Sequence, residues 1–454
     1  MRTLLLLLTA AVLTLPAADR PNVLFIVSDD LNTDLGCYGA KIHSPGIDAL
    51  AKRGVLFERA YCQYPLCNPS RSSFMTGLRP DRTQVFDNAK VVREQVPNLV
   101  TMPQAFRSAG YRAVRIGKLY HYGVPKEIGT SGLDDAESWD AVINPKGKDK
   151  EVEARIHTLT PGQFGGTLSW LAVEGRDDQF TDGIAADAAI AQLKELKGRP
   201  FFLAVGFYRP HTPFVAPLHW FSRYPQEDIT LPEPRLPSDN PANVPQAALA
   251  GAKKEQASMT DEQRRAAIQA YHASISHMDA QVEKVLKALD DLDLAKDTIV
   301  VFTSDHGYNL GHHGLWQKMS LFEQSTRVPL IIAGPGVSEG GKTCGRPAEL
   351  VDLFPTLAEL CGVTPPTTLS GLSLAPQLKD VTAAGRTVAF SMARNGRSIR
   401  SERWRYTEWK GGAEGVELYD HDTDPGELKN LAGDPAHQAT VTELKALLAQ
   451  ETGR

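Results

Sequence analysis

The sequence predicts an α/β fold: a large, mainly parallel, doubly wound sheet, followed by a smaller C-terminal antiparallel sheet with one helix. Short, almost continuously apolar runs of strand length recur through most of the chain, as expected for parallel strands buried on both faces. Segments with helical periodicity separate these runs, and such alternation is typical of a doubly wound sheet. From about residue 370 the runs become short and alternate with polar residues, which indicates an antiparallel sheet exposed on one face.

The composition is that of a globular protein with room for a large core. The chain has 454 residues, 42% of them hydrophobic and 23% charged, which suits one large domain and a smaller one. Its formal net charge is -5, so no overall basic field favours nucleic acid as a partner. If the substrate is an anion, its attraction must come from a local cluster of cationic side chains.

The first 18 residues have the features of a signal peptide. Arg2 supplies a positive charge, residues 4–15 an apolar run, and residues 16–18 a site suited to cleavage. A membrane anchor is the alternative, but the run is too short to span a bilayer comfortably, and no later segment is apolar enough. We therefore expect an exported protein without a stable membrane span, which would be periplasmic or extracellular, or lysosomal in an animal cell.

Residues 19–370 form the expected main domain, in which apolar runs alternate with helical segments. The longest helix has a capping box at Thr260, where Gln263 reaches back to the cap. Two stretches without clear periodicity, 124–181 and 216–259, are expected to be loops that shape the rim of a site. The predicted strands cover residues 21–28, 111–116, 200–207, 297–304 and 328–332, and the predicted helices cover 48–52, 102–108, 184–196, 260–289 and 350–360.

Residues 371–454 form the expected C-terminal subdomain. Their apolar positions alternate with polar ones over short stretches, so one face of the predicted sheet would be solvated. A helix would cover the other face. The predicted strands cover residues 387–391, 397–399, 404–408 and 416–419, and the predicted helix covers 440–449.

Reactive side chains follow four of the predicted strands, at the point where each strand ends. In a doubly wound sheet the site forms outside the carboxyl ends of the strands, so these side chains should converge. Two adjacent carboxylates repel each other unless a cation or hydrogen-bond donors lie between them, whereas a single aspartate is more often a helix cap. The residues are Asp29 and Asp30 after the first strand, Lys118 after the second, His211 after the third, and Asp305 and His306 after the fourth.

The carboxylates and the imidazole among these residues would make an oxygen-rich cage for a hard cation. Such ligands favour Ca²⁺ or Mg²⁺, and we expect Ca²⁺, with the histidine as the unusual ligand. The sequence has no cluster of histidines and cysteines of the kind that holds structural zinc. A bound cation would hold one oxygen of an anionic substrate and lower the pKa of a nucleophile beside it.

The run from Cys67 to Arg71 stands at the start of a segment that can be helical. Its proline at position 69 is tolerated in a first helical turn, because the missing N–H would be unpaired there anyway. Cys67 would then lie beside free backbone donors and a fixed cation, where an anion can be held. For a lone cysteine, a buried structural role is the common alternative. The chain has five cysteines, and an odd number in an exported protein suggests one thiol with a separate fate.

The run from Cys67 to Arg71, followed by Thr76 and Gly77, resembles the signature of the type I sulfatases, which have an alkaline-phosphatase-like fold. The resemblance covers most of the chain and is closest to iduronate-2-sulfatase-like members. It implies that a formylglycine-generating enzyme oxidises Cys67 to formylglycine, an aldehyde whose hydrate is the nucleophile. Asn68 departs from the pattern, since a small residue is more common there. The segments that carry the resemblance are 22–30, 35–39, 67–77, 117–118 with 121, 201–206 with 210–211, 302–307 with 316 and 318, 417–420 and 424–425.

The resemblance also implies a set of metal ligands. Asp29, Asp30, Asp305 and His306 look like the residues that hold the cation, together with the modified Cys67. The histidine stands where other sulfatases often carry asparagine, which indicates the iduronate-type branch. The region 19–370 would then be the catalytic domain.

The remaining basic residues would act on the ester. Arg71, Lys118 and Lys318 would neutralise the oxyanion charge, which grows at the leaving oxygen. By the resemblance, the hydrated aldehyde attacks sulfur and expels the sugar alcohol, and His211 or Lys318 protonates the leaving oxygen. His121 then helps to remove a proton from the second hydroxyl, so that sulfate leaves and the aldehyde returns.

The expected substrate is a sulfated saccharide, and the resemblance points to the 2-O-sulfated uronate of a glycosaminoglycan or to another sulfated polysaccharide. Two other functions stay open. A phosphodiesterase or phosphonate monoester hydrolase of the same superfamily would use the same pocket on a phosphoryl ester. An inactive sulfated-glycan-binding protein would result if Cys67 were never converted.

Overall fold

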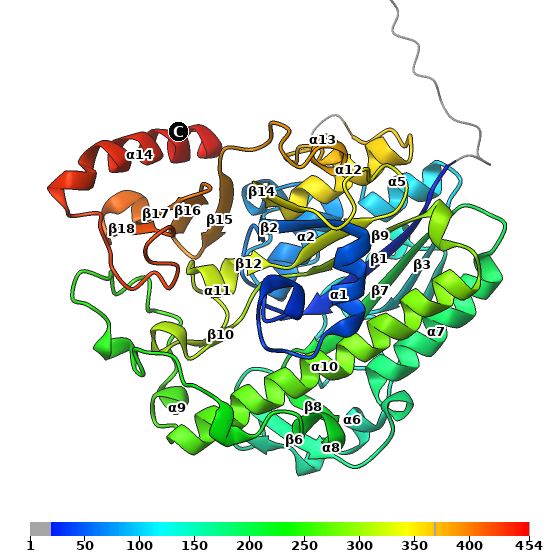
Figure 1. The fold of residues 1–454 in the computed structure, drawn as a ribbon, viewed down its shortest axis with the longest axis horizontal. Helices are drawn as coiled ribbons and strands as arrows, with labels where there is room; N and C mark the ends of the chain where they lie inside the picture. Colours follow the sequence, from blue (N-terminus) through cyan, green and yellow to red (C-terminus); the bar gives the residue numbers. More distant parts are fainter. Residues whose placement is uncertain (1–19, 367–368, 454) are drawn as a thin grey trace, which may run out of the picture.

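The structure is a computed structural model that describes residues 20–366 and 369–453. The expected signal peptide at residues 1–18 lies outside the described residues. A large sheet carries helices on both faces, and a smaller sheet with its own helix stands beside it (Figure 1). Within the described ranges, no helix is long and apolar enough to cross a membrane.

The large sheet has the strand order β12-β2-β13-β9-β1-β7-β3-β4, with β14 paired to β2. β1 lies near its centre, parallel to both β7 and β9, and β3 and β4 extend the parallel part. β13 runs antiparallel to β9 and β2, so the sheet is mainly parallel, as predicted. Its strands are β1 (Asn22–Asp29), β2 (Gly54–Tyr61), β3 (Arg112–Gly117), β4 (Ala141–Ile143), β7 (Phe201–Pro210), β9 (Thr298–Ser304), β12 (Arg327–Val328), β13 (Leu330–Ala333) and β14 (Thr343–Glu349).

The packing of β1 shows why the apolar runs become central strands. Its side chains alternate between two hydrophobic clusters: Leu24 and Ile26 belong to one, and Val23 and Phe25 to the other. All four side chains are completely buried. A strand that is apolar on both faces is stable only when other elements cover both sides, and the helices supply that cover.

Helices α1, α7 and α10 contribute to one of these clusters, and α2, α5, α12 and α13 to the other. The predicted capping box is present, because the Thr260 side chain accepts a hydrogen bond from the Gln263 N–H at the start of α10. The longer helices are α1 (Pro45–Arg53), α2 (Cys67–Thr76), α5 (Met102–Ser108), α7 (Thr181–Leu196), α10 (Asp261–Asp291) and α12 (Leu353–Leu360). The shorter helices are α3 (Pro80–Thr83), α4 (Val92–Gln95), α6 (Lys148–Glu151), α8 (Leu218–Phe221), α9 (Lys254–Ala257), α11 (Glu323–Thr326) and α13 (Ala375–Lys379).

Two parts of the fold differ from the sequence-based prediction. β2 was not predicted, because Glu58 and Arg59 interrupt its apolar run; it pairs with β12, β13 and β14. Residues 124–181, predicted to be loops, contain β4 at the sheet edge and two strands of a separate small sheet. Such short strands depend on their neighbours more than on local propensity. The small sheet consists of β5 (His157–Thr158), β6 (Ser169–Val173) and β8 (Phe214–Pro217).

The predicted C-terminal sheet is confirmed, with four antiparallel strands in sequence order and α14 packed against it. The expectation of a solvated face is wrong, because Trp409 and Tyr419 of the sheet pack in a second hydrophobic cluster with Phe322. Ile399, Tyr406 and Leu418 of the sheet share a hydrophobic cluster with Leu444 of α14. Leu378 of α13, which follows residue 371, packs instead in the core of the large sheet. The elements are β15 (Ala389–Ala393), β16 (Gly396–Arg400), β17 (Trp404–Trp409), β18 (Val416–Asp420) and α14 (Gln438–Thr452), and a separate hairpin pairs β10 (Asn309–Leu310) with β11 (Trp316–Gln317).

Candidate active site

The sequence-predicted site residues gather where the central strands end. Asp29 is the last residue of β1, and Asp305 follows β9 directly. Lys118 follows β3, and His211 follows β7. α2 begins at Cys67, whose side chain lies among the residues that end β1 and β9. The convergence predicted from the parallel topology is therefore present in the structure.

Arg71, on α2, holds the carboxylates of two different strands. Its Nη2 lies 2.9 Å from Asp29 Oδ1, and its Nε lies 2.9 Å from Asp305 Oδ2. Its Nη1 donates to the carbonyl oxygens of Lys118 and Leu119. Each of the three guanidinium nitrogens thus bonds to the protein, and the residue is absent from the cavity lining. This geometry favours a role in ordering the carboxylates over direct contact with a substrate oxyanion.

Lys118 and Asp29 form a second buried ion pair, with Nζ 2.6 Å from Oδ2 and both side chains inaccessible to solvent. Burial alone would raise the pKa of Asp29, but Lys118 and Arg71 hold that pKa well below its usual range. Burial raises the pKa of Asp305 to about 6, although Arg71 and His306 act in the opposite direction. The charged forms of both carboxylates are therefore stabilised by the cationic side chains beside them.

Asp30 turns the chain sharply after β1, with a left-handed φ of 65°. Its N–H donates to Asp305 Oδ1 at 3.0 Å, and the Tyr271 hydroxyl donates to its carbonyl oxygen at 2.8 Å. These bonds hold a backbone conformation that is uncommon outside glycine. The side chain is thereby placed 2.6 Å from Lys318 Nζ and 3.3 Å from His306 Nε2.

Cys67 is completely buried at the first position of α2, beside several cationic groups. Its Sγ lies 3.1 Å from Lys318 Nζ, 3.4 Å from His306 Nε2 and 3.7 Å from Asp30 Oδ1. Burial would raise the pKa of the thiol, but Lys318, Lys118 and His306 hold that pKa well below its usual range. The surroundings therefore stabilise negative charge on a nucleophile at this position.

One side-chain cluster around Cys67 fits a metal ion. Among the described residues Asp30 Oδ2 is buried without a hydrogen-bond partner, which is costly unless a cation meets it. His306 Nδ1 pairs with the Gly307 carbonyl at 2.9 Å, so Nε2 faces the cluster, as in most metal-binding histidines. Asp29 falls in a neighbouring group with Asp30 and His211. The cluster comprises Asp30, Cys67, Asp305 and His306, with one potential ligand atom of each within 4.8 Å of the others.

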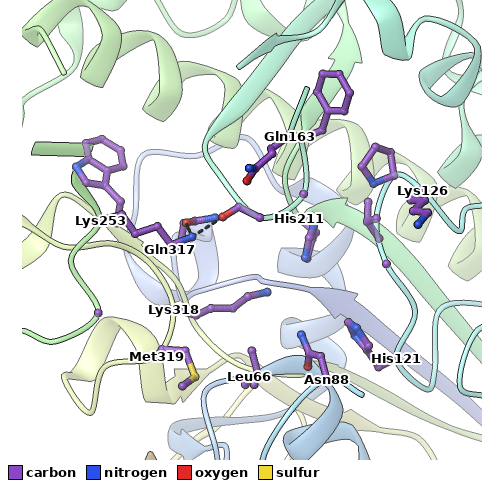
Figure 2. A pocket seen from close by; sticks show the side chains of 18 of the residues that line it. Leu66, Asn88, His121, Lys126, Gln163, His211, Lys253, Gln317, Lys318 and Met319 are labelled. Atoms are coloured by element: carbon purple, nitrogen blue, oxygen red, sulfur yellow. Dashed lines mark hydrogen bonds between the residues drawn. The ribbon is translucent and has the colours of Figure 1, made fainter. Parts of the chain in front are cut away.

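A cavity of about 620 Å³ opens beside these groups (Figure 2). Lys318 and His211 reach into it from opposite sides, and His121 lies near Asn88 on another wall. His211 Nε2 is 3.8 Å from Asp30 Oδ2, so this ring stands between the carboxylate cluster and the cavity. His121 Nδ1 is buried and finds no hydrogen-bond partner in the described part of the chain, and burial lowers the pKa of this histidine. The three predicted basic residues are therefore within reach of a bound ester.

The cavity wall carries further cations that the sequence analysis did not identify. Lys253 Nζ lies 2.6 Å from Gln317 Oε1 (Figure 2), and Lys126 and Arg394 also line the cavity. In residues 20–366 and 369–453, these three cations have no carboxylate within ion-pair distance. Arg394 comes from the turn between β15 and β16, so the C-terminal sheet contributes to the wall. No local pattern marks these residues, because they stand in irregular segments and a hairpin turn.

Two family models match the chain. The model described as Sulfatase matches residues 21–363, and the model described as N-sulphoglucosamine sulphohydrolase, C-terminal, matches residues 311–453. Iduronate 2-sulfatase of Mus musculus is 36% identical over 401 residues, which cover 77% of this chain and 70% of the mouse protein. The first model spans every site residue predicted from the sequence.

Two solved structures resemble this one along nearly its whole length. A 2-O GAG sulfatase has a TM-score of 0.72 and 28% identity, and the match covers 95% of this chain and 91% of that one. The phosphonate monoester hydrolase of Agrobacterium radiobacter has a TM-score of 0.78 and 24% identity, with 96% of each chain covered, and at this identity the likeness shows a shared fold alone. The extent of the family match and the identity to a named sulfatase leave one conclusion: this chain belongs to the sulfatase family.

Proposed function

We propose that this sulfatase removes an O-sulfate group from a sulfated sugar, with Cys67 converted to formylglycine as the nucleophile. The observation that carries the proposal is the setting of Cys67: a buried side chain at a helix start, 3.1 Å from Lys318 Nζ and beside an open cavity. Formylglycine, as its hydrate, would supply two hydroxyl groups at this position. One would attack sulfur, and the other would allow sulfate to be released without a separate hydrolysis of the enzyme ester.

The neighbouring carboxylates would hold a divalent cation. We propose Asp30, Asp305 and His306 as ligands, with Asp29 beside them, and Ca²⁺ in preference to Mg²⁺ because most donors are hard oxygens. The bound cation would supply positive charge to a sulfate oxygen and lower the pKa of a hydroxyl at position 67. Arg71 would keep two of the carboxylates in place through its paired contacts.

The cavity residues would move the protons. His211 and Lys318 both reach into the cavity, so either can protonate the oxygen that leaves with the sugar. His121 borders the same cavity near Cys67, and we propose that it takes a proton from the remaining hydroxyl when sulfate departs. The lysine ammonium also neutralises charge that develops on the ester oxygens.

The proposed substrate is a sugar that carries more than one negative charge, such as a 2-O-sulfated uronate. Lys126, Lys253 and Arg394 line the cavity beyond the position of the nucleophile and lack acidic partners in the described structure. They could meet a carboxylate or a second sulfate, which the net charge of -5 would otherwise repel. The mouse relative is named for iduronate and the similar structure for a 2-O sulfate, which agrees with this class. We also propose export and maturation by a formylglycine-generating enzyme.

Mass spectrometry of the tryptic peptide 60–71 tests the nucleophile directly. We expect an aldehyde in place of the thiol at Cys67 in protein from its native host, while Cys62 in the same peptide keeps its sulfur and serves as an internal control. Replacing Cys67 by alanine should lower kcat by at least about 10³-fold, because it removes the nucleophile. An unmodified thiol at both positions would favour the inactive glycan-binding protein.

Kinetics on matched esters separates the sulfatase from a phosphoryl ester hydrolase. We expect turnover of an aryl sulfate to exceed that of the corresponding aryl phosphate and phosphonate esters. Chelation should abolish turnover, Ca²⁺ should restore it, and metal analysis of the purified protein should find the ion. A strong preference for the phosphoryl esters would contradict the proposal.

A further inference from the structure

The turn that carries His211 is held from inside the protein by a buried arginine, Arg209, near the end of β7. Its Nη1 donates to the carbonyl oxygen of His211 at 2.9 Å and to that of Pro213. The carbonyl oxygen of Thr212, which stands between these two in the chain, pairs with Nδ1 of the His211 ring at 2.5 Å. One guanidinium group therefore fixes the carbonyl groups on either side of the one that orients the ring.

Arg209 is itself anchored to α6 and α7. A buried guanidinium is costly without an anion, and Nη2 lies 2.7 Å from Oδ2 of Asp149, with both residues 2% exposed. The other carboxylate oxygen of Asp149 accepts from the Thr181 N–H, at the start of α7, at 2.9 Å. Asp182, also on α7, accepts from the backbone N–H groups of Tyr208 at 2.8 Å and Arg209 at 3.0 Å. Both the side chain and the backbone of Arg209 are thus held in place.

This anchoring directs the second nitrogen of the His211 ring toward the reacting groups. Because Nδ1 faces the Thr212 carbonyl, Nε2 lies on the other side of the ring, 3.8 Å from Asp30 Oδ2. The ring reaches into the cavity from the side opposite Lys318 (Figure 2). The cavity lining found among the described residues includes His211 but neither Arg209 nor Asp149. The ion pair therefore acts on a bound ester only through the turn that it holds.

We propose that Arg209, paired with Asp149, is a positioning residue for proton transfer: it holds the His211 ring where Nε2 donates a proton to the leaving oxygen. The inference rests on the proposed function and deepens it, since it assigns to His211 a step that His211 or Lys318 can perform. As the nucleophile's oxygen bonds to sulfur, the bond between sulfur and the leaving oxygen breaks and its electron pair stays on that oxygen. The oxygen takes the proton from Nε2 and departs as a neutral alcohol, which leaves a neutral imidazole.

The need for this proton depends on the leaving group, which gives a readout that a loss of folded protein does not change. A nitrophenolate is a weak base and leaves readily as an anion, whereas an unsubstituted phenolate is a stronger base and gains more from protonation. A misplaced general acid therefore slows phenyl sulfate more than 4-nitrophenyl sulfate. When both esters are measured on one preparation, the ratio of their kcat/KM values does not depend on the fraction of folded protein or of formylglycine.

The experiment measures this ratio, 4-nitrophenyl sulfate over phenyl sulfate, in wild type, R209K, D149N and H211A. Lysine keeps a positive charge beside Asp149 but carries its donors on one atom, so it cannot reproduce the fork that meets the carboxylate and both carbonyl oxygens. D149N removes the charge that orients Arg209 and leaves the sequence of the turn intact. We expect the ratio to rise at least about tenfold in R209K and D149N, and about 10²-fold in H211A.

A double variant shows whether Arg209 acts through His211. R209K/H211A should have the ratio of H211A, because the arginine can position only a ring that is present. R386K is the matched control, with the same substitution in a second buried ion pair. Arg386 pairs with Asp352 and donates to the Ser370 carbonyl oxygen at 3.3 Å, but it does not line the cavity. Its ratio should equal that of the wild type.

Unchanged ratios in R209K and D149N, an equal rise in R386K, or a further rise in the double variant beyond H211A would overturn the inference and leave the proposed function standing. A wild-type ratio in H211A would do the same, because it would assign the proton to Lys318. Wild-type protein that hydrolyses phosphate or phosphonate esters and neither sulfate would instead overturn the proposed function. A ratio that rises in R209K, D149N and H211A and not in R386K supports the inference.

Discussion

Single buried residues in this protein depend on the charge of their neighbours. Arg71 is held between Asp29 and Asp305 with no access to solvent, and without it each carboxylate would lose a buried cation. His313 shows the opposite case, a titratable group that is buried without a carboxylate at ion-pair distance among the described residues. Its ring stacks on Phe322 with centroids 3.7 Å apart, and Nε2 has no hydrogen-bond partner within residues 20–366 and 369–453.

His313 should make stability depend on pH. Burial lowers the pKa of His313 to about 4, although the charge of Glu427 acts in the opposite direction. The unfolded chain takes up a proton near the usual value of 6.5, so the contribution to stability is complete above that pH and is lost as the pH falls toward 4. The loss amounts to about 3 kcal/mol.

Urea unfolding of wild type and H313F between pH 4.5 and 8 measures this contribution. Phenylalanine keeps the stacked ring and cannot titrate, so the free energy of unfolding of H313F should fall less steeply with acid. The difference between the two proteins isolates this group from all other titrations. Equal pH dependence in both would contradict the assignment.

At the residue scale, sequence reasoning found the residues that follow buried strands and those in the signature run. Cys67 and Asp305 are of this kind, whereas Lys318 was predicted through the family resemblance. It did not find Lys253 or Asn88, because each reaches the cavity from an irregular segment whose path is set by tertiary contacts. A single sequence contains no local signal for such placement.

Secondary-structure elements were best predicted where local chemistry and burial agree. The start of α10 was predicted from its capping box, and the central strands from runs that are apolar on both faces. β2 was missed because its half-exposed charges break the run, although the strand is held by neighbours on both sides. The short strands between 124 and 181 were missed for a related reason, because pairing partners from elsewhere in the chain define them.

The capping box of α10 gives a prediction at this scale. T260A removes the side-chain acceptor of the Gln263 N–H and should lower the free energy of unfolding by about 1 kcal/mol. Activity should not change, because Thr260 does not line the cavity. T442A is the control: this exposed threonine lies within α14 and bonds the Gln438 carbonyl, so its removal should cost nothing. Equal destabilisation by both changes, measured by urea unfolding, would argue against the cap.

The whole molecule is joined by a buried charge network between the two sheets. Arg405 of β17 bonds to Glu323 of α11 and to Glu427 beyond β18. Tyr61 of β2 donates to Glu323 at 2.9 Å, so the network reaches the large sheet. Burial would raise the pKa of Glu323, but Arg400 and Arg405 hold it well below its usual range. The C-terminal sheet is therefore attached through buried ion pairs, whose separation would cost considerable free energy.

R405M should lower the free energy of unfolding by about 3–5 kcal/mol, because it removes the cation that two buried carboxylates share. The double variant R405M/E427Q should recover part of this loss. R403M removes an arginine that pairs with Asp420 on the same sheet, but is half exposed, and should have little effect. Chemical unfolding measures all three, and an R405M effect as small as that of R403M would refute the role of the network.

The topology of β1 determines when, during synthesis of the chain, the pocket around Cys67 can form. Asp30 meets Asp305 across 275 positions of the chain, so the pocket around Cys67 cannot close until that distant segment has been synthesised. At about 5–20 residues per second, the interval is roughly 15–55 s. In the finished protein Cys67 is inaccessible. An enzyme that modifies this side chain therefore has to act within that interval or before folding is complete, and slower synthesis would lengthen its opportunity.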